Sequence, residues 1–235
     1  MPKLRTADWC GFRCRHDVTM KRITLLMLGW ACTAAAQTTG NVGIFEGASD
    51  VGKPSHKGSV VYDAARKEYR VTGGGDNMWA ARDDFFFVWR KVTGDVVITA
   101  NLKIVTGGAP HRKAGLIIRQ DLEPGSVYAD AVVHGSGLTG LQWREKTDDV
   151  TRTIHFPGDG PTRLRLERRR NVVTLFAGKE GGALAEMGNT EMAPFSPIYA
   201  GLGVCAHDDT AETTAIFSDV TVEILPPPSG AASKK

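Results

Sequence analysis

From residue 37 onward the chain is a succession of short apolar or alternating runs, separated by Gly, Pro, Asp and Asn. No segment keeps a helical repeat of apolar residues for three turns, whereas short strands with turn residues between them fit the pattern throughout. Evenly spaced strands joined by glycine turns indicate two antiparallel sheets that each bury one face. The sequence therefore predicts an all-β protein, a two-sheet antiparallel jelly roll.

The expected strands follow directly from these runs. They lie near 58–63, 68–73, 84–90, 94–104, 113–120, 127–134, 138–146, 149–156, 162–168, 171–178, 198–205 and 213–224. The proline-rich end at 226–235 has few backbone donors for a sheet and is expected to be a disordered tail. One domain over 37–225 is therefore predicted.

The beginning of the chain has the three parts of a secretory signal peptide. The basic pair Lys21-Arg22 precedes an apolar run at 23–31 and three alanines at 34–36. This order predicts cleavage after Ala36 and a secreted or periplasmic protein. The apolar run is far shorter than the roughly 20 residues that a membrane span needs, so no transmembrane span is expected.

Two details of this leader leave alternatives. Met20 lies directly before the basic pair, so residues 1–19 are interpreted as an over-extended start and 1–36 as start plus signal peptide. Cys32 keeps lipidation open as an alternative, although Gly29 stands three residues before it where a lipoprotein signal prefers Leu.

The net charge of +3 belongs to the leader. The chain has 29 Lys and Arg and 26 Asp and Glu, and residues 1–36 hold six and two of these, which leaves 23 basic and 24 acidic residues. A general electrostatic attraction to nucleic acid is therefore not expected. Cys205 is the lone cysteine after residue 36, which excludes a disulfide or a zinc knuckle within one processed chain.

Strand parity places several polar residues on one face. Successive side chains of a strand point to opposite faces, so His134 shares a face with Tyr128, and Gln142 shares one with Arg144. A tight Gly-Ser-Gly connection at 135–137 brings these strands together, and Arg119 ends the strand before them. Two interpretations remain open: a polar depression that binds a ligand, or an ordinary solvated outer face.

The order of these segments resembles a known superfamily. The segments are GSVVYD at 58–63, YRVTGGGDNMW at 69–79, RDDF at 82–85, WRKVTGD at 89–95, HRKAGLIIR at 111–119, VVHGSGL at 132–138, LER at 166–168 and GVCAH at 203–207. Together they resemble a bacterial exported branch of the concanavalin A-like lectin/glucanase superfamily. This branch is similar to the C-terminal jelly-roll domain of some beta-xylosidases and to domains found beside Tol-type propellers. The resemblance implies a jelly roll in a carbohydrate-linked setting.

The carboxylates do not form the catalytic motif of the superfamily's glucanases. Those enzymes use a Glu-x-Asp-x-x-Glu strand, which is missing here. Glu167 lies among arginines and is interpreted as a paired surface charge, and the pair at 83–84 as turn or strand-end residues. Asp208-Asp209 leaves a structural calcium ion possible, although no full ligand set is visible. No cofactor is otherwise predicted.

Three functions remain open. The first is an exported carbohydrate-binding module for an oligo- or polysaccharide, with Trp79 as an aromatic platform and Arg119, His134, Gln142 and Arg144 bonding hydroxyls. The second is a polysaccharide lyase that acts on uronate-containing glycans by β-elimination, with His134 and Tyr128 as catalytic residues. The third is an envelope interaction domain without a small ligand. Trp79 in the core and His134 as a structural, hydrogen-bonded group are the plainer alternatives.

Overall fold

The computed structural model describes residues 42–226, which consist of strands, turns and loops. The expected leader at 1–36 and the expected tail from residue 227 lie outside the described residues. Residues 42–226 form two seven-stranded sheets and one two-stranded hairpin, and every strand pairing within this range is antiparallel. The predicted all-β, two-sheet jelly roll is confirmed. Across 42–226, no helix has the length and apolar character to cross a bilayer.

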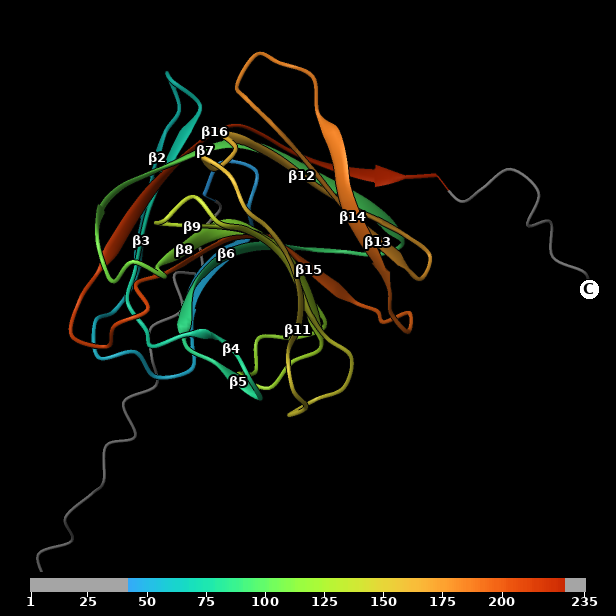
Figure 1. The fold of residues 1–235 in the computed structure, drawn as a ribbon, viewed down its shortest axis with the longest axis horizontal. Helices are drawn as coiled ribbons and strands as arrows, with labels where there is room; N and C mark the ends of the chain where they lie inside the picture. The colour runs from blue at the N-terminus through green and yellow to red at the C-terminus, as the bar shows by residue number, and fades with distance from the viewer. Residues whose placement is uncertain (1–41, 227–235) are drawn as a thin grey trace, which may run out of the picture. The chain divides into compact units, whose positions relative to one another are not determined.

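The first sheet is called the covered sheet. In spatial order it contains β1 (Gly47–Val51), β6 (Phe85–Val92), β15 (Ile198–Cys205), β8 (Lys113–Arg119), β9 (Tyr128–His134), β10 (Thr139–Arg144) and β11 (Arg152–Phe156). The hairpin of β4 (Met78–Trp79) and β5 (Arg82–Asp83) lies on the concave side of its curved strands (Figure 1).

The second sheet is called the open sheet. Its order is β14 (Ala185–Glu191), β13 (Val172–Gly178), β12 (Arg163–Arg169), β7 (Asp95–Gly107), β16 (Thr213–Leu225), β3 (Glu68–Gly73) and β2 (Ser59–Asp63). Its strands form the other layer of the sandwich in Figure 1. Each sheet thus joins strands that are far apart in the sequence.

The core lies between the two sheets. Leu116 and Ile118 of β8 and Leu164 and Leu166 of β12 are all fully buried there, at alternate positions of their strands. Each such side chain contributes about 1.5–3 kcal/mol by leaving water. The period-two pattern of the sequence therefore sets which face of each strand points inward.

Most expected strands match the observed ones closely, and four short strands were missed. The missed strands are β1, β4, β5 and β14. Both β4 and β5 have only two residues, which is too short to produce a pattern. The strand β14 lies at a sheet edge, and its side chains are exposed or half-buried throughout, so it carries no alternation of apolar and polar residues.

Candidate functional site

The outer face of the covered sheet carries the polar residues that strand parity places together. Lys113 is directly opposite His134 in the β8–β9 pairing, and Gln142 is directly opposite Asp130 in the β9–β10 pairing. His134 and Gln142 line one cavity. The shared orientation of these two side chains is therefore as expected, whereas a role in binding stays a prediction.

This cavity, the histidine cavity, has a volume of about 260 Å³. Strands of the covered sheet provide its floor, and loops and the β4 strand provide its walls. Its lining residues are Asn77, Trp79, His111, Lys113, His134, Leu138, Gln142, His155 and His207. The volume is slightly below the range of about 300–1,000 Å³ typical of ligand pockets, which suits one small polar group or sugar unit.

His134 has a fixed orientation in this cavity. Its Nδ1 lies 2.9 Å from the carbonyl oxygen of Leu138, which can only accept, so Nδ1–H is the donor. The other ring nitrogen, Nε2, is then an acceptor in the neutral imidazole. Burial, with smaller contributions from the nearby Lys113, His111 and His155, lowers the pKa of His134 to about 4, although the hydrogen bond with Leu138 acts in the opposite direction. His134 is therefore a neutral base at neutral pH.

Lys113 brings an amine to the cavity from a buried position. Its side chain is 3% exposed, and Nζ donates to Oδ1 of Asn77 over 2.5 Å. Burial lowers the pKa of Lys113. Asp130 lies on the same sheet face, and burial raises the pKa of its carboxyl group well above the usual range. The neutral form of Asp130 is therefore favoured.

Two buried polar atoms of the cavity lining are without a partner in the described part of the chain. Among the described residues, neither Oε1 of Gln142 nor Nδ1 of His207 has a hydrogen-bond partner, although both atoms are buried. Buried polar groups in proteins are nearly always hydrogen-bonded. Since both residues line the histidine cavity, these atoms are available to a polar ligand.

The hairpin that carries Trp79 is held to the sheet by a buried ion network. Asp83 accepts a hydrogen bond from Arg119 at 3.0 Å and two from Arg144 at 2.8 and 3.0 Å. Arg144 also donates to the carbonyl oxygen of Ala80 in the hairpin turn, over 2.9 Å from Nη2. Trp79 is half-buried beside this turn and lines the cavity.

Three of the proposed site residues lie away from the histidine cavity. Arg119 and Arg144 are at most 1% exposed, and their guanidinium groups bond Asp83 and backbone carbonyls. Tyr128 is also buried, and its hydroxyl bonds Thr151 over 3.1 Å. None of the three lines the cavity. The sequence left two interpretations of this face, a ligand-binding depression or a solvated outer face. Neither of them predicted arginines that form a buried ion pair with Asp83.

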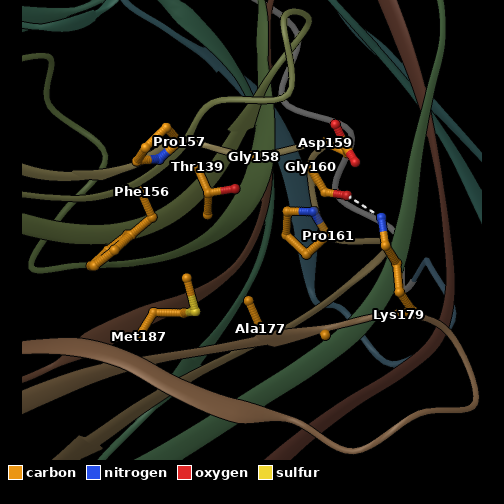
Figure 2. A pocket seen from close by; sticks show the side chains of 11 residues that line it. Thr139, Phe156, Pro157, Gly158, Asp159, Gly160, Pro161, Ala177, Lys179 and Met187 are labelled. Carbon is orange, nitrogen blue, oxygen red and sulfur yellow. Dashed lines mark hydrogen bonds between the residues drawn. The ribbon is translucent and has the colours of Figure 1, made fainter.

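A second cavity lies where β10 and β11 face β13 and β14. Its volume is about 270 Å³, and Figure 2 shows Phe156, Met187 and Ala177 on one side of it. Lys179 closes the other side, and its Nζ donates to the carbonyl oxygen of Gly160 over 2.8 Å. The apolar lining and the occupied amine leave fewer polar groups for a ligand than the histidine cavity offers.

The acidic residues do not form a metal site. Within residues 42–226, no three side chains of His, Cys, Asp or Glu are arranged to hold a metal ion. Asp208 accepts hydrogen bonds from the backbone and hydroxyl of Thr210, and Asp209 accepts from both groups of Ser55. These bonds lower the pKa of both carboxyl groups. Structural calcium at this pair stays a prediction.

Sequence reasoning missed several polar lining residues of the histidine cavity. They are Asn77, His111, Lys113, His155 and His207. Four histidines come from the same end of the covered sheet, because β8 begins, β9 ends, β11 ends and β15 ends there. In the sequence, each of these histidines lies near an end of an expected strand. This position indicates a shared site only when the order of the strands in the sheet is known.

Solved structures with similar folds are very different in sequence. The sequence matches no family model and no curated protein. A functionally unknown protein from Saccharomyces cerevisiae is similar with a TM-score of 0.59 and 14% identity, over 76% of this chain and 97% of that chain. A mutant of the GH43 protein BlXynB from Bacillus licheniformis has a TM-score of 0.53 and 11% identity, over 76% of this chain and 39% of that one.

The fold is a concanavalin A-like jelly roll. The carbohydrate binding module CBM66 from Bacillus subtilis is also similar, with a TM-score of 0.49 and 17% identity, over 73% of this chain and 94% of that one. The resemblance seen in the sequence is confirmed at the level of the fold. In this concanavalin A-like jelly roll, the histidine cavity lies on the outer face of one sheet.

Proposed function

We propose that this protein is an exported carbohydrate-binding jelly roll that holds a sugar unit in the histidine cavity. The observation that carries the proposal is an aromatic ring beside unpartnered polar atoms in one small cavity. Trp79 offers a flat apolar surface, and Gln142 and His207 offer buried atoms without partners in the described chain. Sugar sites combine these two features, because a pyranose has an apolar face and a rim of hydroxyl groups.

The supply of donors and acceptors also suits hydroxyl groups. Nε2 of neutral His134 and Oε1 of Gln142 accept, while the Lys113 amine donates. A hydroxyl group can donate to one of these atoms and accept from another. The similar fold of the GH43 protein adds a carbohydrate setting by analogy alone.

A glycan array tests this proposal, run with and without added calcium. We expect at least one glycan to be retained, and isothermal titration calorimetry to give a one-to-one complex. If the ring stacks on the sugar, Trp79→Ala should weaken binding by the free energy of the lost apolar contact and by about 0.5–1.5 kcal/mol more for the lost stacking. No retained glycan on a broad array, with folded protein, would contradict the proposal.

A matched substitution separates the two cavities. Phe156 lines the second cavity (Figure 2) as Trp79 lines the histidine cavity. Phe156→Ala should leave glycan binding unchanged. If Phe156→Ala abolishes binding and Trp79→Ala does not, the sugar lies in the second cavity and the proposed site is wrong.

Polysaccharide lyase activity is the second candidate, and one observation favours it. His134 is a neutral imidazole whose orientation is fixed by Leu138, as a general base requires. Tyr128, the expected partner in proton transfer, is buried under the hairpin and bonded to Thr151. Incubation with alginate, pectate, glucuronan and ulvan, followed by unsaturated-uronate absorbance, distinguishes the two: binding without cleavage favours the module. If the protein neither binds a glycan nor cleaves one of these polymers, an envelope interaction domain would be favoured.

A further inference from the structure

We propose that the sugar in the histidine cavity carries an anionic group, a carboxylate or a sulfate ester. This inference rests on the proposed function. The chain has six histidines, and four of them line this one cavity together with Lys113. No aspartate or glutamate is among its lining residues. A wall of nitrogen groups without a carboxylate suits an acidic ligand better than a neutral one.

The four imidazole rings surround a common space. The ring centroid of His111 is 5.8 Å from that of His134 and 5.7 Å from that of His207, and the centroids of His134 and His155 are 6.2 Å apart. These rings come from four parts of the fold: the loop before β8, the strand β9, the strand β11 and the loop after β15. Several nitrogen atoms can therefore contact one anionic group from different sides.

Lys113 holds its amine at this cavity from a buried position. Its amine is almost completely buried, and the one hydrogen bond that it makes among the described side chains is to the neutral amide of Asn77. A buried amine without a paired carboxylate is costly, because burial penalises its charged form. An anion in the cavity would supply the missing counter-charge.

The acidic groups near the cavity do not replace such an anion. Asp130 is fully buried and does not line the cavity, and although Lys113 acts to lower the pKa of its carboxyl group, burial raises that pKa overall. Asp76 affects His207 from the loop before β4, and this effect is smaller than those of burial, Lys113 and His111, so the pKa of His207 is lowered overall. The titratable groups that line the cavity are Lys113 on β8 and the four histidines.

Binding of an anion should therefore be coupled to proton uptake. In the empty cavity the buried imidazole of His134 is neutral, with a pKa of about 4. A bound negative charge favours the protonated imidazoles, and by linkage protonation favours the bound anion. For each proton taken up, affinity should rise by up to about tenfold per pH unit as pH falls.

Calorimetry with four small probes tests the proposal. The probes are methyl glucuronide, glucose 6-sulfate, the neutral methyl glucoside and inorganic sulfate, each titrated in EDTA at pH 5.5 and pH 7.5. We expect one of the two acidic sugars to bind at least tenfold more tightly than methyl glucoside, and more tightly at pH 5.5. The comparison of the two acidic sugars identifies carboxylate or sulfate as the preferred group.

Two variants and a control locate the effect. His111 and His155 are exposed residues of the lining, so the variants His111→Ala and His155→Ala should fold. Each should lower the affinity for the acidic sugar several-fold. His56 lies beside Glu212, outside the cavity, and His56→Ala should bind as the original protein does. Equal loss in all three variants would overturn the proposal.

The outcomes for the two proposals differ. If methyl glucoside binds as tightly as the acidic sugars, the anionic inference fails and the carbohydrate-binding function stands. If inorganic sulfate binds as tightly as glucose 6-sulfate and no other sugar binds, the cavity is an anion site and both proposals fail. If none of the four probes binds, the anionic inference is wrong, and the glycan array alone decides the proposed function.

Discussion

The outer faces of the two sheets differ in what covers them. In the covered sheet, every residue of β8, β9 and β10 is buried, so both faces of these strands are out of water. In the open sheet, β13 alternates strictly between buried and half-buried residues, and β2 alternates between half-buried and exposed. A sandwich needs one buried face per sheet. The second buried face is therefore a special feature of the covered sheet, and the histidine cavity lies in it.

The two faces use the same residue types in different ways. On the open sheet, Glu167 pairs with Arg165 and Arg169 as expected, but its own side chain is only 11% exposed, and the exposed members of the group are the two arginines. Burial acts to raise the pKa of Glu167, but hydrogen bonds from the two arginines lower it overall. Against the covered sheet, Asp83 of the β4–β5 hairpin pairs with Arg119 and Arg144, and all three side chains are at most 1% exposed. A carboxylate between two arginines thus has exposed partners on the open sheet, whereas the other such group is a fully buried anchor against the covered sheet.

The largest expected effect comes from removing that anchor. Asp83→Ala leaves the guanidinium groups of Arg119 and Arg144 buried without their carboxylate, so we expect a loss of about 3–5 kcal/mol in the free energy of unfolding. Glu167→Ala, the matched change on the open sheet, should cost about 0–1 kcal/mol. Urea unfolding of both variants measures the difference. Similar losses in the two variants would show that the faces are not energetically distinct.

The second-largest expected effect is a pH dependence of the free energy of unfolding that comes from His134 on the covered sheet. The pKa of His134 is lowered from 6.5 to about 4 in the folded protein, so the unfolded chain binds the proton more tightly. The stabilising contribution of neutral His134 is therefore complete above pH 6.5 and is lost as pH falls toward 4. We expect a loss of about 1–3 kcal/mol across this window.

The control for this pH series is His134→Gln. This variant cannot gain the proton, so its free energy of unfolding should fall less between pH 6.5 and pH 4 than that of the original protein. Urea unfolding at half-unit pH steps provides the measurement. Parallel pH profiles of the two proteins would assign the dependence to other groups.

The buried thiol gives a chemical measure of the covered face. Cys205 is fully buried, and burial raises its pKa to about 12. Because the thiolate is the reactive form, a thiol reagent such as DTNB should label folded protein at least about a hundredfold more slowly than protein in denaturant. Fast labelling of folded protein would show that the covered face opens readily.

The smallest expected effect concerns the hairpin turn. Ala80 has a φ of 56°, which a residue with a side chain adopts at a cost, and its side chain is exposed. Ala80→Gly should therefore raise the free energy of unfolding by about 0.4–1 kcal/mol. Ala211→Gly, at a position without positive φ, should lower it instead. A stabilising effect in both variants would contradict this account.

Most of the strands, and the face on which each of their side chains lies, follow from local patterns in the sequence. Alternation in β8, β9 and β10 depends on the residues of each strand alone, so His134 and Gln142 were placed on one face without a structure. The same local information placed Arg119 and Arg144 on that face. It could not indicate what would cover them.

The tertiary structure decided which of these residues face a cavity. Asp83 lies 36 residues before Arg119 and 61 before Arg144, in a hairpin with no sequence pattern, and its carboxylate converts two candidate ligand-binding arginines into a buried anchor. The four histidines meet because strands distant in the sequence begin or finish at the same end of the covered sheet. Strand parity is a local property of the backbone, whereas the cover over a sheet face depends on contacts between distant segments.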